Sequence, residues 1–198
     1  MYYLTADTHF MHANIALYCS RPFFSDDEYY INDKGRPEFI SKDIKDRVAE
    51  EMSECIVDNI NKTCCENDTL WLLGDLCFDT VYNGEKRRGD YWVDRLKPKV
   101  NLIRGNHDKK TNVKPIYNEI TGTFEGQRIH LRHKELTDTS NNKPKYDIDL
   151  VLCGHVHNEW KYKYTEYKGK HILNINVGVD QWGLKPVSMS AILKYKGK

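Results

Sequence analysis

Aspartate, asparagine and histidine residues gather in four short motifs, and each motif follows a short apolar run. The motifs are Asp7-Thr8-His9, Gly74-Asp75, Gly105-Asn106-His107-Asp108 and Gly154-His155-Val156-His157. Short apolar runs that end in glycine or polar residues predict buried strands. Because open α/β sheets bind ligands at the carboxyl ends of their strands, we expect these side chains to meet at one edge.

Metal binding is the chemistry that this mixture of side chains indicates. Carboxylate, carboxamide and imidazole ligands suit Mn, Fe, Zn or Ni, whereas calcium prefers oxygen alone and copper(I) prefers sulfur. In Asp-x-His and His-x-His the side chains are two residues apart, so an extended backbone would point both the same way. Gly74, Gly105 and Gly154 precede motif residues, where positive φ or close backbone approach is expected.

Alternating strands and helices are predicted to position these motifs. Apolar runs predict strands at 2–6, 69–73, 100–103 and 150–153. Apolar residues spaced by three and four predict a helix over 44–60 with Ser41 as its N-cap, and a shorter helix is expected at 91–96. This alternation favours an α/β layered fold.

The second half of the chain has a different pattern. Two-residue alternation around Ile129 and again from Trp160 to Tyr164 predicts hairpins, with a turn at Lys168-Gly169. A last strand is expected within 187–193. Polar stretches at 25–38, 108–115 and 134–147 are predicted loops.

Length and composition predict a single globular domain spanning 1–198. The chain has 39% hydrophobic residues, and 30 Lys+Arg against 29 Asp+Glu leave a net charge of +1. That balance excludes a basic field that would hold nucleic acid or an anionic membrane without specificity. With no targeting segment or membrane-spanning run recognised, we expect a cytoplasmic protein, and the six cysteines, which lack CxxC spacing, are expected to be reduced.

The order of the motifs resembles that of the calcineurin-like metallophosphoesterases. Asp-x-His, Gly-Asp, Gly-Asn-His-Asp, a further histidine and Gly-His-x-His follow one another between Asp7 and His157. The string DTHFMHANIALYCSRPF at residues 7–23 also resembles the opening of a small single-domain branch. Patterning alone supports only α/β or α+β, whereas the resemblance implies a four-layer α-β-β-α sandwich of two mixed sheets flanked by helices.

The resemblance also implies a dinuclear metal centre and a reaction. Two divalent ions would be bound, with manganese first and iron, zinc or nickel as alternatives. One ion would be held by Asp7, His9 and His157, the other by Asn106, His133 and His155, with Asp75 bridging both. A metal-bridging hydroxide would hydrolyse phosphate monoesters or diesters. His130 competes with His133, but His133 shares strand parity with apolar Ile129 and Leu131.

His107 is the general acid that the resemblance implies. In relatives of the protein-phosphatase type, an aspartate three residues after the Gly-Asp aspartate orients this histidine, whereas here that position is Phe78. Asp79 or Asp108 is expected to serve instead. His12 either contacts substrate phosphate or caps a helix, and Arg104 either lines the phosphate entrance or lies in a solvated loop.

Two other classes of function are consistent with the sequence. One is a catalytically inactive scaffold or interaction module that keeps the fold. The other is nucleic-acid binding without catalysis through the basic and aromatic hairpin at 159–171, although lysines there also suit an edge strand. The expected partner is a phosphate ester, with nucleotides and nucleic acids among the candidates and no membrane. Selectivity is expected in loops 20–40 and 134–147, and oligomeric state is left open.

Overall fold

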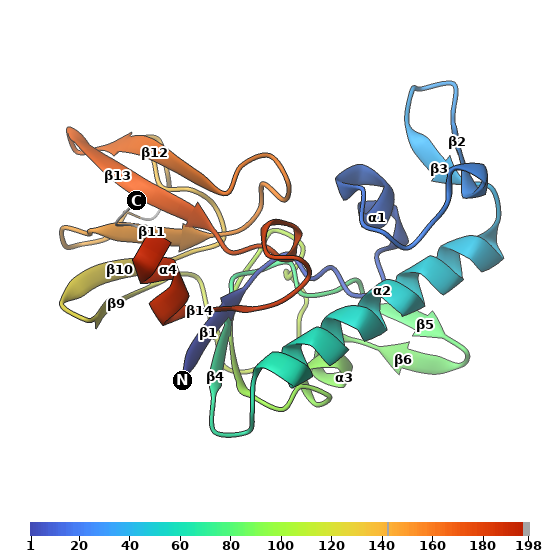
Figure 1. Cartoon of the computed structure of the whole chain (residues 1–198), viewed down its shortest axis with the longest axis horizontal. Helices are drawn as coiled ribbons and strands as arrows, with labels where there is room; N and C mark the ends of the chain where they lie inside the picture. Colours follow the sequence, from blue (N-terminus) through green and yellow to red (C-terminus); the bar gives the residue numbers. More distant parts are fainter. Residues whose placement is uncertain (142, 196–198) are drawn as a thin grey trace.

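Two mixed sheets of five strands each form the centre of the computed structural model, which describes residues 1–141 and 143–195 (Figure 1). The first sheet has the order β14-β1-β4-β7-β8, and the second has the order β12-β13-β11-β10-β9. Two mixed sheets with helices confirm the predicted fold class. The predicted domain 1–198 and loop 134–147 include residues 142 and 196–198, which lie outside the described residues.

Parallel strands dominate the middle of the first sheet. Its strands are β1 (Tyr2–Thr5), β4 (Thr69–Leu72), β7 (Lys99–Ile103), β8 (Ile116–Tyr117) and β14 (Val187–Ser188). Strand β1 pairs parallel with β4, and β4 pairs parallel with β7, so these three strands end at the same edge. Only β14 runs antiparallel to its neighbour β1 within this sheet, among the described residues.

The second sheet also has three neighbouring parallel strands. Its strands are β9 (Ile120–Phe124), β10 (Gln127–Leu131), β11 (Leu150–Cys153), β12 (Tyr162–Tyr167) and β13 (Lys170–Asn176). Strand β11 pairs parallel with both β10 and β13, while β9 and β12 add antiparallel edges. The predicted turn at Lys168-Gly169 joins β12 to β13 and is confirmed.

Helices cover the outer face of the first sheet. These are α1 (Ala13–Cys19), α2 (Lys42–Thr63) and α3 (Gly89–Val93), and in Figure 1 α2 runs diagonally from beside β4 to below α1. Val48, Met52 and Ile56 of α2 are fully or almost fully buried in one cluster with Leu70 and Leu72 of β4, because α2 presents an apolar stripe at helical spacing. Ser41 accepts a hydrogen bond from the Ile44 backbone N–H, which confirms the predicted N-cap.

The space between the sheets is a second apolar cluster. Leu4 and Ala6 pack there with Leu150, Leu152 and Ile175 from the second sheet. On the outer face of that second sheet, Leu136 and Ile148 belong to a smaller cluster. They come from a segment in which the structure records no helix between residues 134 and 149, residue 142 aside. The described part of the chain has no helix long and apolar enough to span a membrane.

Three local predictions need correction, and one hairpin was missed. The short helix expected at 91–96 is α3, which covers Gly89–Val93 and ends earlier. The expected strand 187–193 is wrong beyond its first two residues, because helix α4 (Met189–Tyr195) follows β14 and buries Met189 and Ile192 at helical spacing. The predicted loop 25–38 contains a 3-10 turn (Asp26–Glu28) and most of a hairpin of β2 (Tyr29–Ile31) and β3 (Pro37–Phe39). A further hairpin, β5 (Thr80–Tyr82) with β6 (Glu85–Arg87), was not predicted, although Asn83-Gly84 is a hairpin turn signal. A second 3-10 turn covers Val179–Gln181.

Candidate metal centre

The carboxyl ends of the parallel strands from both sheets meet at one place. Within the first sheet, the loop after β1 is hydrogen-bonded to the loop after β4, since the Asp7 N–H donates to the Gly74 carbonyl and the His9 N–H donates to the Asp75 carbonyl, both at 3.0 Å. Between the sheets, the Val179 N–H donates to the carbonyl of Ala6 at 3.0 Å. These backbone bonds fix the segments that carry the candidate ligands.

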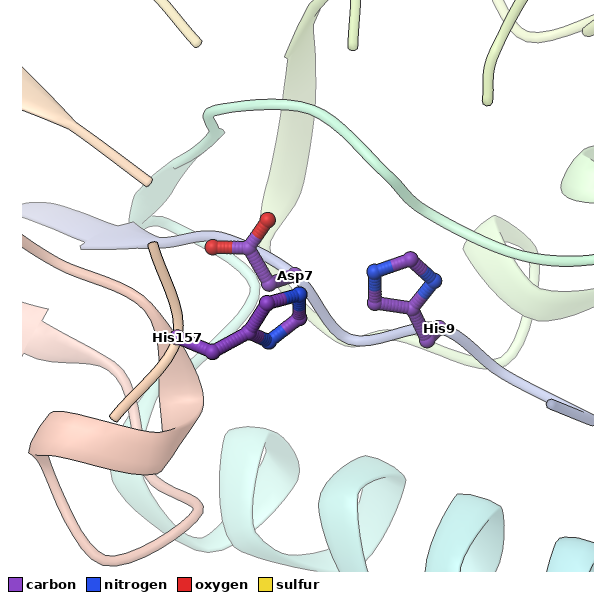
Figure 2. Close-up of side chains that lie close together, drawn as sticks. All are labelled: Asp7, His9 and His157. Atoms are coloured by element: carbon purple, nitrogen blue, oxygen red, sulfur yellow. The ribbon is translucent and has the colours of Figure 1, made fainter. Parts of the chain in front are cut away.

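Asp7, His9 and His157 form the first group of candidate ligands (Figure 2). One ligand atom from each residue lies within 4.8 Å of the others. Asp7 Oδ1 and both ring nitrogens of His9 are buried and have no hydrogen-bond partner among the described residues. Buried polar atoms normally have partners, so this donor set fits a cation that would satisfy them.

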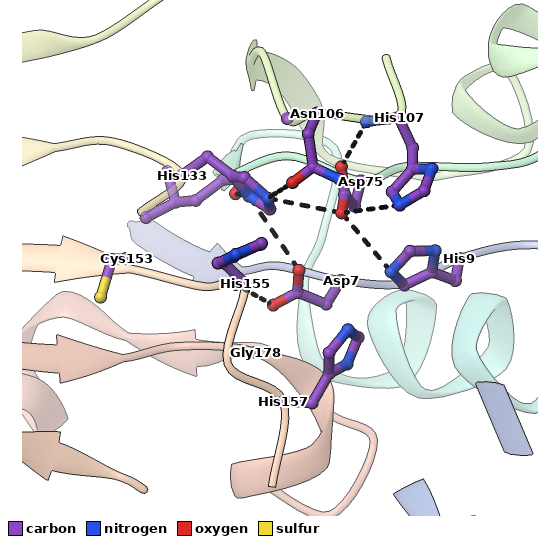
Figure 3. A network of polar contacts seen from close by, with 12 residues as sticks. Asp7, His9, Asp75, Asn106, His107, His133, Cys153, His155, His157 and Gly178 are labelled. Atoms are coloured by element: carbon purple, nitrogen blue, oxygen red, sulfur yellow. Dashed lines mark hydrogen bonds and ion pairs between the residues drawn. The ribbon is translucent and has the colours of Figure 1, made fainter. Parts of the chain in front are cut away.

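Asp75, His133 and His155 form the second group, again with one ligand atom each within 4.8 Å of the others. Asn106 Oδ1 lies 3.0 Å from His133 Nε2, which brings the amide to the same place. Asp75 Oδ2 lies 3.4 Å from His133 Nε2 and 3.6 Å from His9 Nε2 (Figure 3). The Asp75 carboxylate therefore faces both groups at once.

Most of these ligands have an unusual backbone conformation. The five residues Asp7, His9, Asp75, His155 and His157 have positive φ, between 47° and 73°. The left-handed region is strained for residues other than glycine and occurs most often at functional sites. The extended-backbone reason given for Asp-x-His and His-x-His is therefore wrong, because both members of each motif turn out of the strand.

The three predicted glycines leave no room for a side chain beside these ligands, as Gly74 and Gly154 illustrate. Gly74 has a φ of +93°. At Gly154, a Cβ atom would lie 2.5 Å from Asp7 Oδ2, closer than real Cβ atoms approach oxygen. The absence of a Cβ lets the His155 N–H donate to that same oxygen at 2.8 Å, which ties the Asp7 carboxylate to the second sheet.

The structure places His133, and not His130, at the centre. The Nδ1–H of His133 donates to the Leu73 carbonyl at 2.8 Å, which leaves Nε2 facing Asp75. His130 Nδ1 contacts Thr121 Oγ1 at 2.9 Å, and its Nε2 lies 3.6 Å from Glu119. His130 thus lies within β10 and its ring faces β9, whereas His133 lies two residues beyond the end of β10 and its ring faces the centre.

Sequence reasoning missed Arg21 and Asp180, which support the first group. Asp180 Oδ2 lies 2.9 Å from His157 Nδ1 and also accepts from Arg21 Nη2 at 2.9 Å. Arg21 is only 2% exposed, donates from Nε to Asp180 Oδ1 at 2.7 Å, and donates from Nη2 to the Asp7 carbonyl at 2.8 Å. Asp180 follows β13 as the motif residues follow their strands, so its position was the available signal. Cys19 lies beside this pair, within 4.8 Å of His157 and Asp180 by their ligand atoms.

Burial and nearby charges shift the pKa values of the candidate ligands. Burial raises the pKa of Asp7 to about 6 and lowers the pKa of His9 to about 2. Burial would also lower the pKa of His157, but the hydrogen bonds to Asp180 and Cys19 and the charge of Asp7 together outweigh it and raise the pKa to about 10. His157 is therefore protonated at neutral pH in this arrangement, and metal ligation by its ring requires loss of a proton.

His107 lies at the edge of the centre with its side chain 44% exposed. Its Nε2 is 4.0 Å from Asp75 Oδ2, and its backbone N–H donates to Asp75 Oδ1 at 2.9 Å. The ring packs against Phe78, with 5.1 Å between ring centroids. His107 also lines the metal cleft, a cavity of about 450 Å³ that includes His9, Asp75 and His155.

The two acids expected to orient His107 have other surroundings. Both oxygens of Asp108 accept backbone N–H groups, from Asp75 at 2.8 Å, Leu76 at 3.0 Å and Gly105 at 2.8 Å. Asp108 thus fixes the turn that carries Asp75. Asp79 is exposed and lines a separate cavity of about 230 Å³ together with His107. Asp75 is the carboxylate that the structure places near the His107 ring.

Of the two candidate substrate contacts, only His12 reaches the cleft. It occupies the N-cap position of α1 but makes no side-chain capping bond, and its ring centroid lies 4.1 Å from that of Phe78. Burial lowers its pKa to about 4, so the ring is neutral at pH 7. Arg104 is exposed and is not among the residues that line the cleft.

The fold and the site together define a two-sheet α/β protein with a candidate metal centre between its sheets. The sequence model of the calcineurin-like phosphoesterase superfamily domain matches residues 42–198, and the chain belongs to this superfamily. The match includes the candidate ligands from Asp75 to His157, whereas Asp7 and His9 precede it. The resemblance predicted from the motifs is confirmed.

The similarity to other proteins covers almost the whole chain. The uncharacterized protein MJ1445 of Methanocaldococcus jannaschii is 28% identical over 203 residues, which cover 99% of this chain and 92% of that protein. The crystal structure of AQ665 from Aquifex aeolicus, a protein of unknown function, superposes with a TM-score of 0.62 at 24% identity and covers 98% of both chains. That structure shows the same fold.

Proposed function

We propose that the protein is a dinuclear metal-dependent phosphoesterase that hydrolyses phosphate monoesters or diesters. The observation that supports this proposal best is the position of Asp75. Its carboxylate faces His133 of the second group at 3.4 Å and His9 of the first group at 3.6 Å, and each group contains residues from both sheets. A carboxylate with ligands on both sides is suited to bridge two cations, and paired cations are a common device for phosphoryl hydrolysis.

The ligand sets follow from the two groups. Asp7, His9 and His157 would hold one ion, and Asn106, His133 and His155 the other, with Asp75 shared. Manganese is the first choice for both positions, with iron, zinc or nickel as alternatives, because the donors mix oxygen and imidazole nitrogen. When bound, the cations supply Lewis acidity toward the phosphoryl oxygens and lower the pKa of water.

His107 would donate the proton to the departing oxygen. Its exposed ring borders the cleft, so a leaving group can reach it, and general acids of this kind contribute about 10²–10⁴ in rate. Asp75 and Phe78 would hold the ring in place, the former at 4.0 Å from Nε2. Asp79 and Asp108, which were first expected to orient His107, would then have other roles. Asp79 lines the separate cavity of about 230 Å³, and Asp108 fixes the backbone turn that carries Asp75.

His12 would contact the substrate without adding charge. Its ring lies on the cleft beside His9, and its Nδ1 is buried without a hydrogen-bond partner among the described residues. Because its pKa is lowered to about 4, the neutral ring can exchange a hydrogen bond with a phosphoryl oxygen or an ester group.

Elemental analysis combined with a substrate screen tests this function. We expect the purified protein to bind two equivalents of a transition metal and to hydrolyse 4-nitrophenyl phosphate or bis(4-nitrophenyl) phosphate after addition of manganese. Asp75→Asn should remove metal and activity together. Hydrolysis by Asp75→Asn at the parent rate would contradict a mechanism that depends on metal held by Asp75. A parent protein that binds metal but hydrolyses no ester would instead support an inactive scaffold.

A further inference from the structure

A second cavity adjoins the metal cleft on the side of the second sheet. It has a volume of about 550 Å³ and shares His155, Val156 and Glu159 with the cleft. The segments that follow β10 and β11 form its walls, so it opens beside the same strand ends that carry His133 and His155. A group attached to a phosphate in the metal cleft can therefore extend past His155 into this cavity.

Arg132 lines this cavity and is the chemically unusual residue in it. The side chain is only 9% exposed, and its Nε and Nη1 have no hydrogen-bond partner among the described residues. Nη2 donates to the Asn141 carbonyl at 3.3 Å, a long bond. Glu119 attracts Arg132 electrostatically, but the described residues include no carboxylate within 4.0 Å of its nitrogens.

Burying a guanidinium without a counter-ion is costly. Isolated buried charges are normally paired, and unsatisfied donors on a charged group cost more than those on a neutral one. Arginine's planar set of donors matches the oxygens of phosphate and carboxylate groups. An anion in the cavity would therefore supply the negative charge and hydrogen-bond acceptors that the described residues around Arg132 lack.

The remaining charged residues on the wall agree with an anionic occupant. Lys163 donates to Glu135 at 3.3 Å, so these two residues largely neutralise one another. Lys134 and Glu159 are both exposed and line the cavity, so their charges cancel in the net charge of the lining. Arg132 is then the uncompensated charge of this cavity, and Trp160 adds an apolar surface beside it.

We propose that this cavity is a subsite for a second anionic group of the substrate, bound by Arg132. The inference rests on the proposed phosphoesterase function and narrows it. The substrate class becomes phosphate esters with a further phosphoryl group near the reacting one, such as nucleotide derivatives that carry two phosphates. Esters with a single phosphate would react at the metal centre without using the subsite.

Two substrates with the same leaving group separate the subsite from the reaction. We choose the 4-nitrophenyl ester of thymidine 5′-phosphate, with and without a phosphate on the 3′ oxygen. The parent protein should prefer the doubly phosphorylated ester. Arg132→Met should reduce kcat/KM for that ester by about 10–100-fold, the range for a hydrogen-bonded charged group, and leave the singly phosphorylated ester unchanged. Equal reduction for both esters, or for neither, would overturn the subsite.

Binding of inorganic phosphate to the chelator-treated protein gives a readout that does not depend on catalysis. We expect calorimetry to show binding to the parent protein, weaker binding to Lys134→Met and no binding to Arg132→Met. Lys99→Met is the matched control, because it removes the same charge from an exposed lysine at the start of β7 that does not line this cavity. If Arg132→Met bound phosphate as tightly as the parent protein, the subsite would be overturned whether or not the protein hydrolysed any ester. If the parent protein bound phosphate through Arg132 but hydrolysed neither ester, only the phosphoesterase function would be contradicted.

Thermal unfolding distinguishes an anion site from a structural arginine. Replacing a buried unpaired charge by a side chain of similar length is often neutral or stabilising, so Arg132→Met should keep or raise the parent Tm. A marked fall in Tm without ligand would show that the guanidinium supports the fold instead. Because Lys134 is exposed, we expect Lys134→Met to fold, so this variant tests the subsite even if Arg132→Met does not fold.

Discussion

The first sheet supplies the carboxylates of the candidate metal centre, whereas all three ligands from the second sheet are histidines. Asp7 and Asp75 follow β1 and β4, while His133, His155 and His157 follow β10 and β11. The negative charge that attracts cations therefore comes from one sheet. The imidazoles from the other sheet would complete the coordination of a bound cation, and they can be protonated when no cation is bound.

The two sheets also hold their ligands differently. On the first sheet, backbone N–H groups converge on Asp108, which fixes the turn beneath Asp75. On the second sheet, His133 is held by a carbonyl of the first sheet, and His157 is held by Asp180. The comparison indicates that the first sheet forms a rigid base and that side-chain bonds orient the imidazoles against it. Substitutions on the first sheet should therefore have larger effects.

The largest effect is expected for Asp75→Asn. The neutral amide cannot bridge two cations, so both ions should bind more weakly and hydrolysis should fall below detection. Metal content by mass spectrometry and steady-state rates measure the two losses. Asp58→Asn, which changes an exposed carboxylate on α2, is the control and should keep parent values. Retention of two tightly bound ions by Asp75→Asn would contradict the shared position of this carboxylate.

A smaller and more selective loss is expected for His107→Ala. This residue lies on the first sheet's loops but is outside both ligand groups, so metal content should stay at the parent value. Rates for esters with poorly leaving alcohols should fall by about 10²–10⁴, because the departing oxygen then lacks its proton donor. Nitrophenyl esters, whose leaving group needs no proton, should be hydrolysed at nearly the parent rate. A loss that is independent of the leaving group would argue against the acid role.

Strand ends were the part of this site that the sequence could predict. Parallel neighbouring strands end at one edge, so the residues that follow them converge whatever the detailed loop conformation. His133 could be separated from His130 for a similar reason, since side chains alternate along a strand. Both inferences depend only on periodicity, which burial enforces along the whole element.

The missed features depend on contacts that have no spacing rule. Arg21 and Asp180 are 159 residues apart and meet only because the sheets pack together. The clamp formed by Asp108 uses backbone N–H groups, whose positions follow from turn geometry and not from residue type. At 187–193 the apolar residues fit both a period of two and helical spacing, so the sequence did not distinguish α4 from a strand.

A loss confined to one metal position is expected for Asp180→Asn. The neutral amide holds His157 less firmly and lowers its basicity, and changes of this kind typically weaken metal binding by about 10–100-fold. The group of Asp75, His133 and His155 does not contact Asp180, so its ion should keep its affinity. Titration with a competing chelator should therefore resolve two classes of site in the variant. Equal weakening of both ions would show that the second sheet is not held by separate side-chain bonds.

The smallest effect concerns the pH dependence of stability in the chelator-treated protein. The pKa of Asp180 is lowered to about 2 by His157 and Arg21 despite burial, which would raise it, and the pKa of His157 is raised to about 10. A lowered carboxyl pKa stabilises the fold above the unfolded value near 3.8, and this stabilisation is lost as the pH falls toward 2. A raised histidine pKa stabilises the fold below the unfolded value near 6.5, and this stabilisation is lost as the pH rises toward 10.

The contribution of this pair should therefore be greatest between about pH 4 and pH 6.5. Urea unfolding of the parent protein and Asp180→Asn across pH 3 to 9 measures it as the difference in unfolding free energy. We expect that difference to be bell-shaped, with a decrease of about 1 kcal/mol by pH 3, where about half of the stabilisation from the lowered pKa of Asp180 is lost. If the difference in unfolding free energy stayed constant over this range, the hydrogen bond to Asp180 would orient His157 without shifting its pKa. Electrostatics would then not distinguish how the second sheet holds its imidazoles from how the first sheet holds its carboxylates.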